Sequence, residues 1–201
     1  MNAKTSIPVF QQVFQDQWQI LPAVIKKRYA IAPYSDQSIT VEGLLDVSCK
    51  WFIWPVTKIM GVLPPYNQKK VPVTVIFRSQ PDNAAFCFDR TFYFHHKPPF
   101  KFFSSLFQEK GTQVAEVTRI GLCSLFNMEF DGTAVKMVHA GYAWQVGGKR
   151  IKLPLTWLLG RVKGSEKAVD EHHFDMQVSV THWLLGELYR YEGRFKLVED
   201  E

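Results

Sequence analysis

The spacing of apolar side chains divides the chain into a helical first third and a β-rich remainder. Before residue 65, apolar residues recur every three or four positions, starting with Phe10, Val13, Phe14 and Trp18. This spacing places them on one face of a helix. After residue 70 the period changes to two, which is typical of strands with one buried face. The change predicts helices followed by an antiparallel sheet.

Start and stop signals predict three helices in the first third. Ser6 can cap a first helix that has Pro8 in its first turn, and Pro22 opens a second helix. The third covers residues 50–60 and ends at Gly61, because glycine accepts the left-handed backbone that terminates many helices.

Two tight turns interrupt the predicted strands. Asp131-Gly132 predicts a hairpin over residues 126–138, because glycine accepts the positive φ of a type I′ turn. Gly147-Gly148 offers a second tight turn. Among the expected strands are residues 71–77, 86–94, 112–120, 171–182 and 187–198.

These elements imply an α+β protein in which residues 1–201 form a single domain. Residues 1–65 are mainly helical with one strand, and residues 70–198 are antiparallel β. We expect about eight or nine strands in a strongly curved sheet or incomplete β-barrel, with the N-terminal helices packed on it.

The composition indicates an aromatic-rich interior. Of the 201 residues, 46% are hydrophobic and 14% aromatic, and 16 Phe account for most of the aromatic share. Such side chains fill a thick core or line an apolar cavity. The net charge of +5 is scattered in short groups such as Lys26-Lys27-Arg28. Without a nucleic-acid-binding motif, this charge does not predict nucleic acid as a partner.

The sequence carries no metal-binding or phosphate-binding motif, so we expect neither a metal nor a cofactor. Its three cysteines fit no disulfide spacing, which favours a reduced, cytoplasmic protein. The first residues contain no secretory h-region. No stretch approaches the roughly 20 apolar residues that span a bilayer. The segment Trp51–Leu63, with Lys50 and Lys58, either contacts a membrane interface peripherally or covers the mouth of the β-structure.

The segment Phe86–Phe94 (FCFDRTFYF) places a charge pair inside a run of aromatic residues. Successive strand side chains point to opposite faces, so Asp89 and Arg90 diverge and do not form a catalytic dyad. Arg90 lies among four Phe and needs a carboxylate or several carbonyls as partners, and Glu116 is the best nearby candidate. The other candidates are Glu129, Glu171, Glu187 and Glu192. Three interpretations of Arg90 remain. It forms a buried ion pair that fixes the strand register, or it anchors an anionic or carbonyl group in an apolar pocket. In the third interpretation it is a surface residue whose charged end reaches the solvent.

This pattern favours binding of a small apolar or anionic amphiphilic molecule in an aromatic-lined cavity, and it favours catalysis less. The residues expected to contact the ligand are Arg90, Phe88, Phe92, Phe174, Met176, Tyr189 and Tyr191. As an alternative, an enzyme would hold a carboxylate or carbonyl group with Arg90 and use Glu116 or His172 as acid or base. A further alternative is a structural interaction module with a filled core.

Several short motifs resemble one bacterial family, the domain of unknown function 4166. The matching pieces are FQDQWQILPAVIKKRY (14–29), FDRTF (88–92), VAEVTRIG (114–121), KLPLTWLL (152–159), HHFDMQVSV (172–180) and YEGRF (191–195). The family occurs alone or attached to a saccharopine-dehydrogenase-like NAD(P)-binding domain, and these 201 residues contain no such domain. The resemblance therefore implies no NAD(P) chemistry and no established activity. The resemblance also implies that five residues match the polar and turn positions of the family. These are Arg90, Glu116, Pro154, Asp175 and Gly193.

Overall fold

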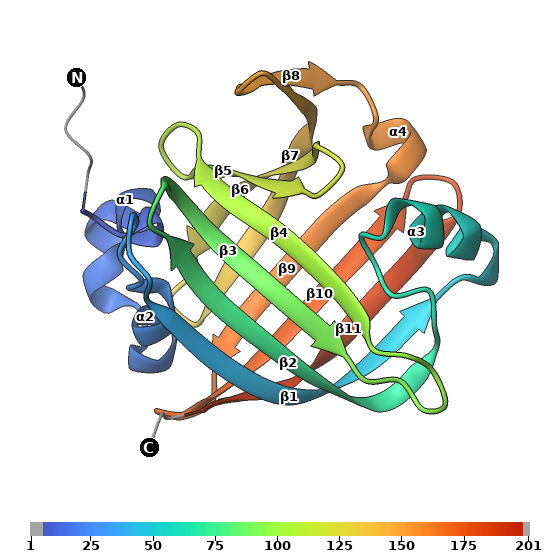
Figure 1. The fold of residues 1–201 in the computed structure, drawn as a ribbon, viewed down its shortest axis with the longest axis horizontal. Coiled ribbons are helices and arrows are strands. Elements are labelled where there is room, and N and C mark those ends of the chain that lie inside the picture. Colours follow the sequence, from blue (N-terminus) through green and yellow to red (C-terminus); the bar gives the residue numbers. More distant parts are fainter. Residues whose placement is uncertain (1–5, 199–201) are drawn as a thin grey trace.

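Within residues 6–198, which the computed structural model describes, eleven antiparallel strands form one sheet that closes into a barrel (Figure 1). The strands are β1 (Ser38–Cys49), β2 (Gln68–Gln80), β3 (Asn83–Phe92), β4 (Phe100–Gln108), β5 (Gln113–Thr118), β6 (Leu122–Phe130), β7 (Ala134–Val146), β8 (Lys149–Leu153), β9 (Arg161–Ala168), β10 (His173–His182) and β11 (Gly186–Leu197). Ten of these strands form the ring, and β8 is an extra strand paired with β7.

The barrel closes where β1 meets β11, at opposite ends of the β-rich sequence. Val41 pairs with Leu197 at one end of this seam, and Cys49 pairs with Tyr189 at the other. Across the ring, β7 pairs with β6 along one edge, and its other edge is shared by β9 and β8. The predicted antiparallel sheet with N-terminal helices is confirmed. The predicted incomplete barrel of eight or nine strands is wrong, because the sheet has more strands and is closed.

Two of the strands lack the alternation of apolar residues that makes a strand recognisable. β9 turns Gly164 and Glu166 toward the interior, where apolar side chains are expected. β4 has neighbouring Phe102 and Phe103, which point to opposite faces. The period of two is therefore hidden in both strands, and this explains the low strand number expected from the pattern.

The seam between β1 and β11 requires two glycines. A Cβ atom added at Gly193 would collide with the carbonyl oxygen of Leu44, and one added at Gly43 would lie 2.5 Å from the carbonyl oxygen of Arg194. Gly193, which the family resemblance places among polar and turn positions, lies inside a strand. Its role there is to let two backbones approach closely.

Both predicted tight turns are present, with one difference in turn type. Gly147 and Gly148 have φ angles of +54° and +78°, the two positive values that a type I′ turn requires. Between β6 and β7 only Gly132 has a positive φ, of +90°, so this turn is not type I′. Here the Asp131 carboxylate accepts a hydrogen bond from the backbone N–H of Ala134 at 2.8 Å.

Helices cover both ends of the barrel (Figure 1). At one end lie α1 (Val9–Phe14), the 3₁₀-helix η1 (Gln15–Ile20) and α2 (Ala23–Tyr29), and at the other end lie the 3₁₀-helix η2 (Trp51–Ile53), α3 (Trp54–Met60) and α4 (Thr156–Leu159). The third predicted helix ends at Gly61 as expected, with φ of +61°, but its α-helical part begins only at Trp54, after the 3₁₀-helix η2. The first helix begins later than predicted, because Pro8 rather than Ser6 is its N-cap. No helix within residues 6–198 has the length and apolarity needed to cross a bilayer.

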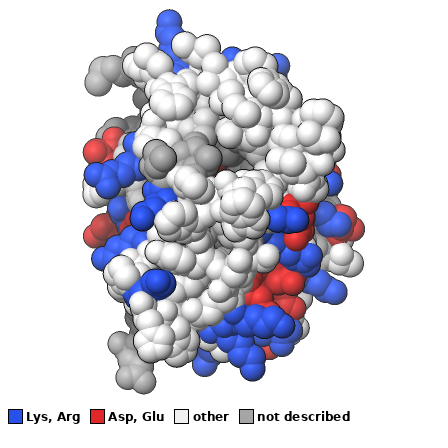
Figure 2. Space-filling view, turned by 90° about the vertical axis from the view of Figure 1, so that its right-hand side faces the viewer, with Lys and Arg blue, Asp and Glu red and all other residues white. Residues whose placement is uncertain are grey.

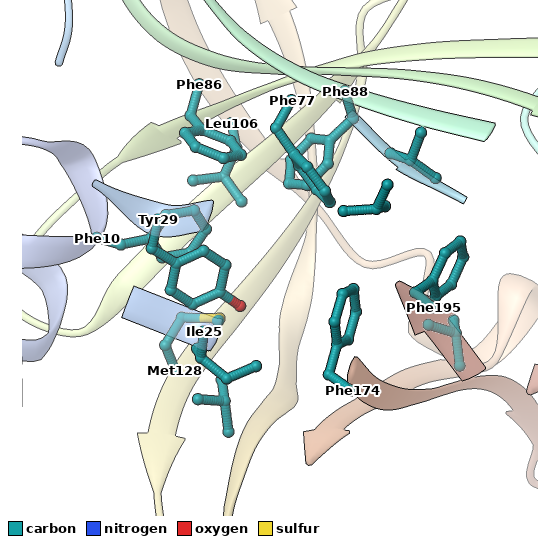
Figure 3. Close-up of a cluster of buried hydrophobic side chains, with 14 of the residues drawn as sticks. Phe10, Ile25, Tyr29, Phe77, Phe86, Phe88, Leu106, Met128, Phe174 and Phe195 are labelled. Carbon is teal, nitrogen blue, oxygen red and sulfur yellow. The ribbon is translucent and has the colours of Figure 1, made fainter. Parts of the chain in front are cut away.

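Aromatic side chains fill the end of the barrel beneath α1 and α2 (Figure 3). The Phe10 ring stacks on Tyr29 with centroids 3.7 Å apart and meets Phe86 edge-on at 4.9 Å. Nearby, Phe174 and Phe195 stack at 5.4 Å. We call these five buried residues the aromatic plug. The plug closes the end of the barrel beneath α1 and α2, and a cavity adjoins it, lined in part by Phe10 and Tyr29.

Candidate functional site

A cavity of about 360 Å³ occupies the barrel between the aromatic plug and the end covered by α3 and α4. Most of its wall is apolar, including Phe88, Leu106, Phe126, Met128, Met176 and Val178. On one side Ile53 of η2 lines the cavity, and on the other side Leu158 of α4 does. Leu158 is also 53% exposed to solvent, so the cavity reaches the surface at this end. We call this opening the mouth.

Arg90 and Glu116 form a polar centre in the cavity wall. Arg90 Nη2 donates to Glu116 Oε1 at 3.0 Å, and Nη1 donates to Ser104 Oγ at 2.9 Å. Ser104 in turn donates to Glu116 Oε1 at 2.6 Å. The guanidinium also lies over the rings of Phe88 and Phe102, 4.4 and 4.8 Å from their centroids. The predicted pairing of Arg90 with Glu116 is confirmed.

The register of three neighbouring strands assembles this cluster. Ser104 lies on β4, two residues beyond the partner of Arg90 and on the same face of the sheet. Glu116 lies on β5, diagonal to Ser104. Asp89 points to the opposite face of β3 and pairs with Arg78, with Nε and Oδ2 2.6 Å apart. Asp89 and Arg90 are therefore not a dyad, as the pleat predicted.

Tyr189 contributes an unsatisfied polar group to the wall. Its side chain is only 1% exposed, and its hydroxyl has no hydrogen-bond partner among the described residues. Burial, and then the neighbouring Tyr191, raise the pKa of Tyr189 well above 10, so the hydroxyl stays protonated. A buried hydroxyl without a partner costs about 1–3 kcal/mol. A polar atom of a ligand in the cavity would offset that cost.

A second ion pair lies on the cavity floor, where α2 meets β9. Arg28 is fully buried and donates to Glu166 through both Nη atoms. The Tyr29 hydroxyl donates to Glu166 Oε2 at 2.5 Å. Tyr29 and Glu166 both line the cavity. Desolvation, together with the charge of Glu166, raises the pKa of Tyr29 well above 10.

This second pair was not predicted from the sequence. Arg28 belongs to the basic run Lys26-Lys27-Arg28, which resembles a solvated surface, and Glu166 lies in a strand without apolar alternation. One signal was nevertheless available. Arg28 follows Val24 by four residues, so it falls on the buried stripe of α2.

The structure brings together five of the seven residues expected to contact a ligand. The cavity-lining residues of that set are Phe88, Arg90, Met176, Tyr189 and Tyr191, and Glu116 joins them. Phe92 and Phe174 lie outside the cavity wall. Phe92 packs against Phe100 and Tyr191, and Phe174 belongs to the plug. That the cavity-lining residues contact a ligand stays a prediction.

The acid–base candidate His172 lies far from the cavity. It belongs to the turn between β9 and β10, at the plugged end of the barrel, and its side chain is exposed. Its backbone N–H donates to Asp170 Oδ1 at 2.8 Å. The strand pattern placed His172 on the face of Phe174, but β10 begins only at His173. The structure therefore separates His172 from Arg90 and Glu116.

The cavity wall combines many apolar side chains with a small number of polar ones. Within residues 6–198 its wall contains no His, Cys or Lys, and no three His, Cys, Asp or Glu side chains gather to hold a metal. The three cysteines are unpaired and buried. Glu116 and Glu166 are each engaged by an arginine. Among the polar groups of the wall, the Tyr189 hydroxyl has no hydrogen-bond partner among the described residues, and Arg90 has N–H groups beyond those that contact Glu116 and Ser104.

The fold and the site define an antiparallel β-barrel with an internal, largely apolar cavity. Residues 21–195 match the family model described as Domain of unknown function (DUF4166). This match covers nearly the whole chain, so the chain belongs to that family, as the short motifs indicated. No curated protein matches the chain significantly.

Proposed function

We propose that the protein binds a small amphiphilic molecule, with its apolar body in the barrel cavity and its polar head at Arg90 and Tyr189. The observation that carries this proposal is a cavity of about 360 Å³ with a mostly apolar wall. Pockets for small molecules commonly measure about 300–1,000 Å³ and contain a few polar groups that orient the ligand. The volume is near the lower end of this range, which favours a medium-length acyl chain or a small ring system.

The charges in the wall determine which head group fits best. Glu116 already neutralises Arg90, and the two hydrogen bonds of Arg90 use two of its five N–H groups. A carboxylate head would bring a second negative charge close to Glu116. A carbonyl or hydroxyl head can accept from Arg90 and pair with Tyr189 without adding charge. We therefore expect a fatty alcohol or ester to bind more tightly than the fatty acid of the same length.

Two alternatives receive less support. An enzyme that uses Glu116 for proton transfer would have to release it from Arg90 and Ser104, which both donate to the same oxygen. His172, the other candidate, lies at the plugged end. A structural module with a filled core does not agree with a cavity of about 360 Å³.

A pair of neighbouring substitutions tests the proposal. Met176 lines the cavity, whereas Gln177 on the same strand is exposed on the outer face. Met176→Trp fills part of the cavity and should weaken binding of a fluorescent fatty-alcohol probe by about tenfold or more. Gln177→Trp should leave binding unchanged. Native mass spectrometry of the purified protein would identify a co-purified ligand. Equal probe binding by both variants and the wild type would refute binding in the cavity.

A further inference from the structure

Apolar side chains at the mouth project into solvent from three separate segments. Trp51 is 83% exposed, Trp157 63% and Trp183 74%. Trp183 Nε1 donates to the backbone oxygen of Trp157 at 3.1 Å, and the N–H of Lys50 donates to the carbonyl of Leu188 at 2.9 Å, so the segments are neighbours. The same surface includes Phe52, Trp54, Leu158, Leu184 and Leu185. We call these eight apolar residues the mouth rim. An exposed apolar patch of this kind marks an interaction site.

The two ends of the barrel differ in charge. At the mouth, the segments 50–67, 93–99, 119–121, 154–160 and 183–185 contain no Asp or Glu. Their basic residues are Lys50, Lys58, Lys97 and Arg119. Each strand-joining turn at the plugged end contains an acid, among them Asp82, Glu109, Asp131 and Asp170. Glu187, close to the mouth rim, is paired with Arg190 at 3.8 Å.

A hollow beside the mouth adds two further basic side chains. Arg161 and Lys163 line it together with Trp157 and Trp183. Both basic side chains are exposed, and neither has an acidic partner within residues 6–198. Figure 2 shows this end of the molecule as a broad uncharged surface with charged residues toward its margins. Within residues 6–198, the mouth rim is thus bordered by Arg161 and Lys163, exposed basic side chains that can meet an anionic surface.

We propose that the mouth rim docks onto an anionic lipid bilayer. The indole and leucine side chains enter the boundary between head groups and acyl chains, and Arg161 and Lys163 contact anionic head groups in the hollow. Docking places the mouth against the acyl region of the bilayer. The bilayer is then the source or destination of the amphiphilic ligand, so this step rests on the proposed function.

A bilayer fits the mouth rim better than a protein partner does. Tryptophan is enriched at membrane–water interfaces, because its ring is apolar and its N–H is polar. Interfacial binding also combines an apolar face with lysine and arginine beside it, the arrangement found here. The rim surrounds the opening of an apolar cavity, and an apolar ligand can cross from acyl chains to that cavity without entering water.

Sedimentation with vesicles tests the docking surface. We expect the full chain to bind vesicles of phosphatidylcholine with phosphatidylserine more strongly than vesicles of phosphatidylcholine alone. The double variant Trp51→Ser/Leu184→Ser should weaken binding to both by about tenfold or more. Arg161→Ala/Lys163→Ala should weaken binding to the phosphatidylserine vesicles by about 25-fold, since each basic residue near an anionic surface contributes about fivefold.

Matched changes at the plugged end serve as controls. Ile20 is 65% exposed and Lys110 lies in the exposed turn after β4, so Ile20→Ser/Lys110→Ala should leave vesicle binding unchanged. Absence of wild-type vesicle binding, or equal loss in the controls, would overturn the docking proposal. So would a dimer in sedimentation equilibrium that Trp51→Ser/Leu184→Ser abolishes, because the rim would then cover a second copy of the chain.

The docking proposal and the cavity proposal can fail separately. Binding of the fatty-alcohol probe in solution should be the same for Trp51→Ser/Leu184→Ser and the wild type, because neither residue lines the cavity. Unchanged probe binding together with lost vesicle binding supports docking by the rim. Vesicle binding in a protein whose probe binding is insensitive to Met176→Trp would support docking and refute the cavity ligand.

Discussion

Replacing Arg90 tests whether the ion pair in the cavity wall stabilises the barrel. Arg90→Met removes the hydrogen bonds that Arg90 gives to Glu116 and Ser104. It also removes the contacts of the guanidinium with the rings of Phe88 and Phe102. Methionine retains an apolar stem of similar shape, so the substitution leaves little new space. The main effect is that the Glu116 carboxylate stays in an apolar wall without its cation.

A buried carboxylate without a cation can avoid its charge penalty by binding a proton. The free energy of that protonation therefore sets an upper bound on the charge penalty. Binding a proton at pH 7 costs about 3.7 kcal/mol for a carboxyl group with an ordinary pKa of about 4.3. Breaking a buried pair from one side typically costs about 3–5 kcal/mol. The Glu116 side chain is 19% exposed, so contact with water relieves part of the penalty. We therefore expect Arg90→Met to lower the free energy of unfolding by about 3 kcal/mol.

A double-mutant cycle separates the pair from other effects of the substitution. Adding Glu116→Leu to Arg90→Met should restore at least about 1.5 kcal/mol, because no charge is then left in the wall. Urea unfolding at pH 7 measures all four proteins. The pair Arg78–Asp89, about one third exposed, provides the matched control, with an expected coupling below about 1 kcal/mol. Strictly additive effects of the Arg90 and Glu116 substitutions would show that the two residues do not stabilise each other.

Three other outcomes follow from backbone geometry and burial. Gly193→Ala should lower stability by about 2 kcal/mol or more in thermal unfolding, because its Cβ collides with the Leu44 carbonyl in the closing seam. Gly132→Val should lower the free energy of unfolding by more than about 1 kcal/mol. The cause is the positive φ of this residue alone, since a Cβ added there meets nothing within 4 Å. An unchanged melting temperature would contradict this expectation. Burial raises the pKa of Tyr142 and of Tyr191 to about 12. Their contribution to stability is therefore complete below pH 10, where unfolded tyrosine is still protonated, and is lost as the pH rises to about 12. Unfolding free energies that stay constant between about pH 10 and about pH 12 would contradict this expectation.

The sequence by itself determined the features that depend on neighbours along the chain. The change of hydrophobic period near residue 70 depends only on which face of a helix or strand each side chain occupies. Gly147-Gly148 predicts the turn between β7 and β8, because glycine accepts the positive φ that this turn requires. The partner of Arg90 was also accessible. A guanidinium among phenylalanines needs a carboxylate, and Glu116 lies two strands away in a simple succession of hairpins.

Only the tertiary structure decided what each face meets. Arg28 and Glu166 are 138 residues apart and become partners because the barrel brings β9 beneath α2. Phe174 and Met176 share one face of β10, yet only Met176 lines the main cavity, since Phe174 lies among the plug residues. A local period assigns a side chain to the inside of a sheet. Whether it then meets solid packing, a charge or a cavity depends on the closure of β1 with β11 and on which helices cover each end.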